Sequence, residues 1–452
     1  MSHHIDEFLR DNLDHYLQQT VRLCSQPSIS AQGYGMHDCA ELVAAILTEH
    51  GLETQIFETP TYPIIVGRAS GKSERTLLFY NHYDVQPVDP LELWTTPPFE
   101  PSIRDGKLFA RGAKDDKGEL IARLAAVDAV RVANAGELPC NVIFVVDGEE
   151  EVGSPNIAKF VRDHLDLLKC DAAVWEEGGI DHDGHPGDSL GCRGVMCLEL
   201  RVRTLTRDAH SGAAHALPNA AWRLVNALST LKGEDERILI PGFYDDVRPP
   251  TKRDLELIDA LPSYEEFARQ QYNVREFVHG HTGKQIEYAV FEPTCNICGI
   301  TSGYQGEGTK TVIPATALAK IDFRLVPDQD ADDILRQLRA HLDAHGFSDV
   351  EVIQPETPIH PYKDDTEHPV IDFALRMGEE VYGKRAYLEP LVGGSSPVYA
   401  FAEPLGNIPV ISPGVGYWDN RTHSPNEHIR IEDFMNAARQ LGRIVEGFAN
   451  VF

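Results

Sequence analysis

Acidic residues and a histidine lie just after several apolar, strand-like runs of this chain, within five residues of their ends. The residues and the runs that precede them are His82 after Leu77–Tyr80, Glu150 and Glu151 after Val142–Val146, and Glu177 after Ala172–Trp175. In an open α/β sheet, ligands bind in the crevice beyond the carboxyl ends of the strands. The sequence therefore favours a layered α/β fold in which one edge of a sheet gathers these side chains.

Asp115 and His423 complete a set of metal-binding residue types. With His82, Glu151 and Glu177 they supply two imidazoles and three carboxylates. Such a set is about what two divalent cations need if one carboxylate bridges them. Glu150 then remains beside the cations, which is where a proton-transferring base is required. The pattern predicts a hydrolase with two metal ions in its catalytic site.

Each motif alone has a commoner structural explanation. His82-Tyr83-Asp84 is typical of a surface histidine, Asp115-Asp116 of an acidic helix start, and Glu149-Glu150-Glu151 of a solvated charge run. However, the three glutamates follow a buried type of strand, and adjacent carboxylates there repel one another unless a cation compensates them. The prediction therefore depends on the combination of motifs.

The composition is that of a soluble globular protein. The chain has 452 residues, of which 42% are hydrophobic and 25% charged, and two domains are expected at this length. The net charge of −29 argues against nucleic acid and anionic membrane surfaces as partners, because both select for positive charge. The N-terminal segment lacks the pattern of a secretory signal, and no apolar run reaches transmembrane length.

The eight cysteines are scattered along the chain, which is typical of free thiols in a reducing compartment. We therefore expect the protein to be cytoplasmic. A single CxxC motif, Cys295–Cys298, has no second pair and lies in a strand-like stretch, so a metal or redox role is not expected there.

The pattern of strand-like and helical segments changes twice along the chain. Residues 1–193 alternate as in an α/β domain with a mostly parallel sheet. Residues 194–361 follow the order of a split βαβ sandwich, and Val195–Val202 alternates as an exposed edge strand does. Residues 362–452 return to the first pattern and contain His423. We therefore expect an α/β fold with a discontinuous catalytic domain, 1–193 and 362–452, and an inserted α+β sandwich domain.

The ordered set of motifs resembles the M20 family of metallopeptidases, over nearly the whole chain. The segments that carry the resemblance are Asn81–Pro87, Arg111–Gly118, Glu150–Ser154, Asp208–Gly212, Lys310–Pro314, Gly393–Pro397 and His423–Glu427.

The resemblance implies a role for each residue of the predicted metal site. It assigns His82 and Glu177 to one cation, Glu151 and His423 to the other, and Asp115 to both. It also implies a cis peptide bond after Asp115, a general base at Glu150, and an Asp84 side chain that orients His82. The cations it implies are Zn²⁺ first, with Mn²⁺ and Co²⁺ as alternatives.

Two positions in this assignment stay open to a shift of one residue. The base is placed at Glu150 rather than Glu149 because family members have the acidic pair one residue before Gly-Ser. The ligand is placed at Glu177 by counting from Asp171, and Glu176 remains the alternative. Many dipeptidase members have Asp at that ligand position.

The inserted domain, by the same resemblance, acts as a lid and dimerisation domain of a homodimer. His210 corresponds to the family histidine that reaches the partner subunit's active site and polarises the scissile carbonyl. Arg324 corresponds to a residue that grips a substrate carboxylate, for which a planar guanidinium is well suited. Thr311, Gly394 and Ser395 are expected to bind the same end of the substrate.

The resulting prediction is metal-dependent hydrolysis of the peptide bond in dipeptides or short peptides with a free C-terminal carboxylate, by a metal-bridged hydroxide. The alternatives are an N-acyl-amino-acid deacylase or a glutamate-type carboxypeptidase and, outside the enzymes, a metal- or peptide-binding scaffold. The presence of Glu150 beside a complete ligand set argues against a scaffold, because a binding protein has no need of a base.

Overall fold

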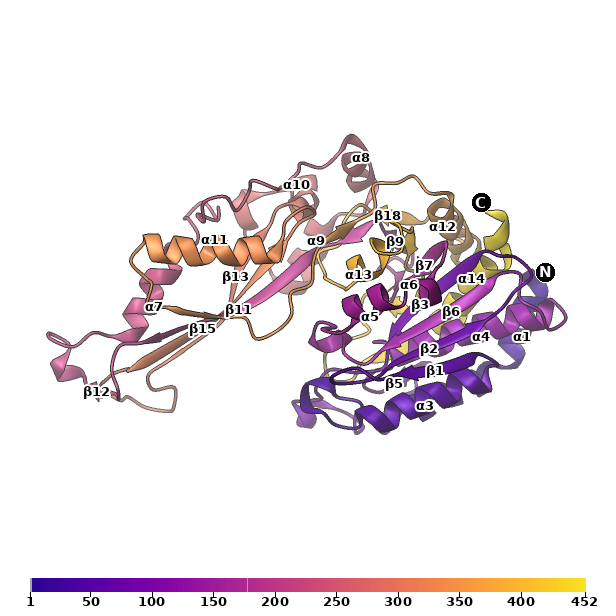
Figure 1. Ribbon diagram of the computed structural model, residues 1–452, viewed down its shortest axis with the longest axis horizontal. Coiled ribbons are helices and arrows are strands. Elements are labelled where there is room, and N and C mark those ends of the chain that lie inside the picture. Colours follow the sequence, from indigo (N-terminus) through magenta and orange to yellow (C-terminus); the bar gives the residue numbers. More distant parts are fainter. Residues whose placement is uncertain (1, 177) are drawn as a thin grey trace. The chain divides into compact units, whose positions relative to one another are not determined.

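The computed structural model describes residues 2–176 and 178–452, which fold as two compact units. Unit 1 comprises Met1–Leu190, Asp364–Pro390 and Pro397–Phe452, and unit 2 comprises Gly191–Lys363 and Leu391–Ser396. Unit 1 is thus discontinuous in sequence: the indigo-to-purple and yellow parts of the chain in Figure 1 both belong to it.

The central sheet of unit 1 has six strands among the described residues. In spatial order they are β1 (Glu53–Phe57), β2 (Ile64–Ala69), β6 (Asn141–Asp147), β3 (Thr76–His82), β7 (Ala172–Val174) and β19 (Val410–Ile411). The strands from β6 to β19 are parallel to their neighbours, whereas β2 runs antiparallel to β6 and β1 antiparallel to β2. The predicted α/β class is confirmed, with an antiparallel extension at one side of the sheet.

Helices cover this sheet, as Figure 1 shows. They are α1 (Ser2–Asp11), α2 (Leu13–Cys24), α3 (Met36–Glu49), α4 (Lys117–Ala133), α5 (Ile157–Asp163), α6 (Leu165–Leu168), α12 (Pro369–Tyr382), α13 (Tyr399–Ala402) and α14 (Ile431–Gly447). Helix α4 is buried along most of its length and contacts α1, α2, α14 and β3. Its buried side chains include Lys117, Glu119 and Arg123 as well as the apolar residues that pack against these neighbours.

Short strands tie the C-terminal part of unit 1 to its N-terminal part. One sheet consists of β4 (Ser102–Arg104), β5 (Lys107–Phe109) and β21 (His428–Arg430), and another of β18 (Tyr387–Glu389), β9 (Pro186–Ser189), β8 (Gly179–Ile180) and β20 (Gly416–Tyr417). The pairing of β21 with β5 continues in a bond from the Ala110 amide to the Glu427 carbonyl, at 3.1 Å. This pairing holds the segment of His423 beside the loop that begins at Arg111.

Unit 2 contains a four-stranded antiparallel sheet in the order β13 (Thr294–Ser302), β15 (Thr316–Leu325), β11 (Gly194–Arg203) and β16 (Glu351–Ile353). Helix α7 (Ala220–Leu228) follows β11 and α11 (Ala331–Ala344) follows β15, which gives the chain order βαββαβ. The excursion between α7 and β13 holds α8 (Lys252–Ala260), α9 (Tyr264–Tyr272) and α10 (Lys284–Tyr288). Two short ladders pair β10 (Gly191–Cys192) with β17 (Tyr362–Lys363), and β12 (Ala209–His210) with β14 (Val312–Ile313).

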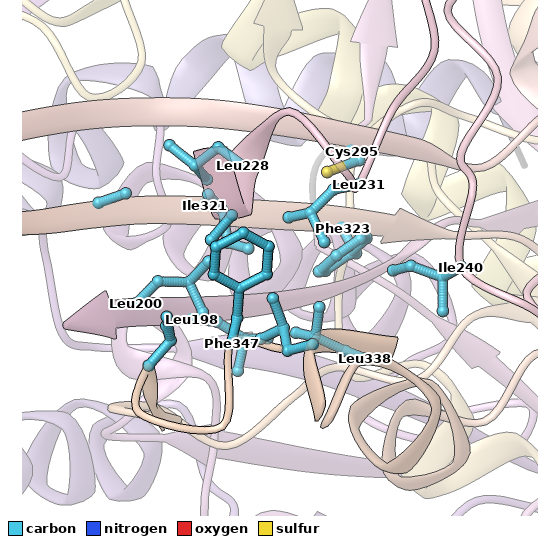
Figure 2. Packing of buried hydrophobic residues seen from close by; sticks show 14 of the residues in the cluster. Leu198, Leu200, Leu228, Leu231, Ile240, Cys295, Ile321, Phe323, Leu338 and Phe347 are labelled. Atoms are coloured by element: carbon cyan, nitrogen blue, oxygen red, sulfur yellow. The ribbon is translucent and has the colours of Figure 1, made fainter. Parts of the chain in front are cut away.

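The core of unit 2 lies on one face of its sheet. Leu198 and Leu200 of β11 and Ile321 and Phe323 of β15 pack there with Leu338 of α11 (Figure 2). Alternate residues of a strand point to opposite faces. The other residues of β11 and β15, Arg324 among them, therefore occupy the face away from this core.

The prediction of an edge strand at Val195–Val202 is wrong. Strand β11 lies between β15 and β16. Its alternating pattern arises because helices cover only one face of the sheet, and an interior strand of an antiparallel sheet then alternates just as an edge strand does.

Each of the eight cysteines is a free thiol, as expected from their spacing. The helices of the described chain include none with the length and apolar character that crossing a bilayer requires.

Candidate metal centre

The predicted ligands of unit 1 begin at the carboxyl ends of three neighbouring parallel strands. His82 is the last residue of β3. The segment Glu149–Val152 follows β6 after Gly148, and Glu176 follows β7 after Trp175. Since β6, β3 and β7 are adjacent and parallel, these segments emerge at the same edge of the sheet.

One group of ligand-type side chains consists of Asp115, Glu151 and His423, whose ligand atoms lie within 4.8 Å of one another. The Nε2 atom of His423 is 2.9 Å from Asp115 Oδ2 and 3.2 Å from Glu151 Oε2. Residues far apart in the sequence are thus brought together by the β5–β21 pairing and the end of β6.

A second group consists of His82, Asp116 and Glu176, all buried, whose ligand atoms also lie within 4.8 Å of one another. The Nε2 atom of His82 is 2.8 Å from Asp115 Oδ1. Asp115 therefore contacts one imidazole with each of its two oxygens, and lies between the two groups.

The second group contains one of the two glutamates, Glu176 and Glu177, between which the sequence does not decide. Glu177, the residue chosen from the sequence, lies outside the described residues. Glu176, the alternative, is 2% exposed and belongs to the group around His82.

Asp116 is a member of the second group that the sequence reasoning does not select. Its Oδ2 atom accepts hydrogen bonds from Asn81 Nδ2, at 2.6 Å, and from the His82 amide, at 3.0 Å. Its position next to Asp115 is the one feature of the sequence that points to Asp116 as part of the site. The peptide bond between the two aspartates is cis, as the resemblance implies.

Asp84 connects the end of β3 to the turn after β6. Its two carboxylate oxygens accept hydrogen bonds from the amides of Glu150, at 3.1 Å, and Glu151, at 3.0 Å. The Nδ1 atom of His82 lies 3.3 Å from Asp84 Oδ1. Gln86 holds the Glu151 carboxylate from the other side, with its amide at 3.1 Å and its Nε2 at 2.8 Å. These bonds fix the ligand side chains before any ion binds.

Glu427 organises the loop from Arg111 to Asp115, a role that the sequence does not reveal. Its carboxylate is fully buried and lies 2.7 Å from Arg111 Nη1. It also accepts hydrogen bonds from the amides of Gly112 at 3.1 Å, Lys114 at 2.9 Å and Asp115 at 3.1 Å. Because three of its contacts go to backbone amides of this loop, Glu427 fixes the path of the chain on which Asp115 lies.

The two candidate bases, Glu149 and Glu150, have different surroundings. The Glu149 carboxylate accepts hydrogen bonds from Thr61 Oγ1 and from Asn156 Nδ2, the latter at 2.5 Å. Burial raises the pKa of Glu150 well above its usual range, and the neighbouring carboxylates, Glu176 first among them, raise that pKa further. Glu150 therefore lies in the electrostatic field of the metal-type ligands, and Glu149 is held by neutral partners.

The neighbouring carboxylates also shift the pKa values of the two imidazoles, His423 and His82. Burial alone lowers the pKa of His423, but hydrogen bonds to Asp115 and Glu151 outweigh it and raise the pKa to about 10. Burial also lowers the pKa of His82, and hydrogen bonds to Asp115 and Asp84 raise it well above its usual range. The carboxylates thus favour a positive charge at the position of the imidazole nitrogens.

The donor set fits divalent cations. Imidazole nitrogens and carboxylate oxygens are the ligands that zinc takes in catalytic sites, and each group supplies both kinds. The crowding of buried carboxylates at one sheet edge is costly without a compensating cation. Asp115, with one oxygen directed to each group, suits a carboxylate shared by two ions.

The predicted substrate-binding residues lie in unit 2. Arg324 Nη1 donates a hydrogen bond to Ser395 Oγ at 2.7 Å, and its strand β15 is an interior strand of the sheet. Gly394 and Thr311 are exposed, and the Thr311 carbonyl accepts a bond from the Ser211 amide at 3.2 Å. His210 ends β12 and is exposed, and its Nδ1 accepts a hydrogen bond from the Gly212 amide at 3.0 Å.

Residues 78–447 match the model of peptidase family M20/M25/M40. The chain belongs to this family. The matched range includes all the ligand-type residues described above. The M20 resemblance found in the sequence, and with it the prediction of a hydrolytic enzyme, is confirmed.

Several M20 relatives resemble the chain over most of its length. It is 29% identical over 394 residues to the beta-Ala-His dipeptidase of Homo sapiens, covering 84% of this chain and 76% of the relative. It is 26% identical to the Cys-Gly metallodipeptidase dug1 of Schizosaccharomyces pombe, covering 98% of each. The crystal structure of the M20 family metallo-carboxypeptidase Sso-CP2 from Sulfolobus solfataricus has a TM-score of 0.91 and 33% identity, covering 96% of this chain and 99% of that one.

Proposed function

We propose that this M20 peptidase is a metal-dependent dipeptidase that hydrolyses the peptide bond of dipeptides or short peptides with a free C-terminal carboxylate. The observation that carries the proposal is Asp115, which contacts His82 with one oxygen and His423 with the other. The dipeptidase activity of the human and fission yeast relatives supports the choice of substrate.

The proposed ligands are His82 with Glu176 or Glu177 for one ion, Glu151 with His423 for the other, and Asp115 for both. We propose Zn²⁺ as the ion, with Mn²⁺ and Co²⁺ as the alternatives that such oxygen- and nitrogen-rich sites accept. When bound, the two ions would supply positive charge that polarises the scissile carbonyl and makes a water molecule more acidic.

Glu150 is the proposed general base. It lies among the ligand-type residues, where burial and the neighbouring carboxylates raise its pKa, and the positive charge of bound cations would offset that rise so that the carboxylate can accept a proton. Glu150 would take a proton from the attacking water and deliver it to the nitrogen of the leaving amine. Asp84, which accepts hydrogen bonds from the amides of Glu150 and Glu151 and lies beside His82, would hold these residues in position for the proton transfer.

The assignments in unit 2 extend the proposal to the substrate. Arg324, held by Ser395, is proposed to bind the substrate carboxylate, with Gly394 and Thr311 contributing hydrogen bonds. His210, exposed at the end of β12, is proposed to polarise the scissile carbonyl in the partner subunit of a homodimer. The free cysteines support a cytoplasmic location.

The test is a substrate panel on the purified protein loaded with Zn²⁺ or Mn²⁺. The panel contains dipeptides, tripeptides and N-acetyl amino acids, and release of free amino acids is measured. The proposal predicts turnover of dipeptides above the other classes. Turnover of N-acetyl amino acids alone would contradict the dipeptidase assignment, and inactivity towards the whole panel would contradict a hydrolytic function for these substrates.

A carboxypeptidase is the second candidate, because the Sulfolobus solfataricus metallo-carboxypeptidase has a TM-score of 0.91 with this chain. A carboxypeptidase removes the last residue from peptides of several lengths. If tetrapeptides and longer peptides are shortened from the C-terminus as fast as dipeptides are cleaved, this second function replaces the first.

A further inference from the structure

Arg193 stands immediately before β11 and shares a sheet face with Arg324. In the β11–β15 ladder, Val195 lies opposite Arg324 and Gly194 opposite Leu325. Residues two apart on a strand point to the same face, so Arg193 and Val195 are on the face of Arg324. Arg193 is then the diagonal neighbour of Arg324, at a spacing that long side chains can bridge.

The Arg193 guanidinium is buried and incompletely bonded. The residue is 8% exposed, its Nη2 atom donates to the Glu292 carbonyl at 2.6 Å, and its buried Nε atom has no hydrogen-bond partner. Within the described parts of the chain, neither Arg193 nor Arg324 forms an ion pair. A buried guanidinium without a carboxylate is costly, and an anionic ligand is its natural complement.

Both arginines are attached to the same loop. The Arg193 amide donates to the Val392 carbonyl at 3.2 Å and to the Gly394 carbonyl at 3.0 Å. Arg324 Nη1 donates to Ser395 Oγ at 2.7 Å. The loop that the sequence associates with the substrate carboxylate is therefore fixed by the backbone of one arginine and the side chain of the other.

Asp322 is a carboxylate on the same face, two residues before Arg324. Asp322 Oδ2 lies 3.0 Å from both Asn296 Nδ2 and Cys298 Sγ, so that oxygen is already engaged. Burial lowers the pKa of Arg193 to about 10, and the positive charge of Arg324 contributes to this decrease, although Asp322 and Glu292 act in the opposite direction. Arg193 is therefore charged at neutral pH, and the guanidinium of Arg324 repels it.

We infer that Arg193 is a second carboxylate-binding residue, which together with Arg324 forms a two-guanidinium site for the carboxylate end of the substrate. A carboxylate placed between two guanidinium groups accepts charge-assisted hydrogen bonds from both. It also relieves their mutual repulsion. The identity of the ligand, a substrate carboxylate, rests on the proposed peptidase function. The site itself is argued only from residues of unit 2.

The test compares a dipeptide with its C-terminal amide in the variants Arg193→Gln and Arg193→Lys. Losing one charge-assisted bond should raise KM for the free acid about tenfold or more, with kcat changed little. The amide lacks the carboxylate, so its kcat/KM should stay within about twofold. Arg193→Lys keeps the charge but not the planar fork, and should recover part of the lost affinity.

Arg201→Gln is the matched control, because Arg201 is on β11, on the face of Arg324, but is exposed and paired with Glu199. It should leave both substrates unaffected. A merely structural role for Arg193 would impair acid and amide in parallel, and that result would overturn the inference, as would an unchanged KM for the acid.

A binding measurement separates this inference from the proposed function. The probe is a dipeptide analogue with a methylene in place of the scissile carbonyl, titrated calorimetrically as free acid and as amide. The wild type should prefer the acid, and Arg193→Gln should reduce that preference about tenfold or more, with Arg324 still present, while unfolding at the wild-type temperature. Equal preference in both proteins would overturn the inference, whatever the enzyme hydrolyses.

Discussion

Glu150 and Glu149 differ by a single position in the sequence, but their side chains have opposite environments. Glu149 is held by Thr61 and Asn156, whereas burial and the negative charges of Glu176 and the other ligand-type carboxylates raise the pKa of Glu150. The distinction could not be made from composition, because all three residues of the run are glutamates.

Glu150→Gln should retain the bound metal and lose about 10²–10⁴-fold in kcat, because only the proton transfer is removed. Glu149→Gln is the matched control, since its amide oxygen can still accept from Asn156 while its NH2 group donates to the Thr61 hydroxyl oxygen, and its kcat should fall by less than about tenfold. The measurement is dipeptide turnover together with metal content. Full activity in Glu150→Gln would remove the residue from the role of base.

The choice between Glu176 and Glu177 is the second question at this scale. Because Glu176 lies in the group with His82 and Asp116, Glu176→Gln should release one of two bound ions. Glu177→Gln is the paired variant. Metal analysis after dialysis decides between them: one ion lost in Glu177→Gln and both retained in Glu176→Gln would restore the choice made from the sequence.

At the scale of single elements, the position of the site could be predicted because it follows from the apolar runs. The runs that become β3, β6 and β7 are parallel neighbours; His82 ends β3, and Glu150 and Glu176 lie within three residues of the ends of β6 and β7. The hydrogen bonds that hold the ligand-type side chains in place could not be predicted in this way. Glu427 reaches Gly112, Lys114 and Asp115 only because β21 pairs with β5, a long-range contact that leaves no periodic signal.

Glu427→Ala should lower the free energy of unfolding by about 3–5 kcal/mol, because Arg111 is then buried without its partner. The backbone amides of Gly112, Lys114 and Asp115, which donate hydrogen bonds to Glu427, would also lose their acceptor. Urea denaturation of the metal-free protein gives the change directly. A decrease below about 1 kcal/mol would mean that water replaces the carboxylate and that Glu427 is not the organiser of this loop.

Strand β9 carries a carboxyl group that should make stability depend on pH. Burial raises the pKa of Asp188 to about 7, although the amides of Ser189 and Ser412 donate to its Oδ1 atom. The folded protein therefore binds this proton more tightly than the unfolded chain does. Its contribution to stability is complete below the unfolded pKa of about 3.9 and is lost as the pH rises to about 7.

Asp188→Asn should reduce this dependence, since the amide oxygen still accepts both bonds but does not titrate. Melting temperatures of the metal-free wild type and variant, measured between pH 5 and pH 8, provide the comparison. The wild type should lose more stability than the variant over this range. Parallel curves would show that Asp188 titrates normally in the folded state.

At the scale of the whole molecule, the chain must leave unit 1, build unit 2 and return before the metal centre is complete. Asp115 and His423 lie in different parts of the sequence, and unit 1 includes residues on both sides of the 191–363 segment. This discontinuity is expected from the sequence because the ligand types lie on both sides of a segment with a different periodicity. The interior position of β11 could not be predicted from the sequence. The alternation of apolar and polar residues shows which face of a strand is buried, but not whether the strand has a neighbour on each side.

The central claim is that unit 1 gathers two imidazoles and several carboxylates around a pair of cations. Anomalous diffraction from crystals grown with Zn²⁺ tests it most directly. The account predicts two peaks per chain, one at His82 and the other at Glu151 and His423, with Asp115 between them. A single peak, or peaks away from Asp115, would contradict it.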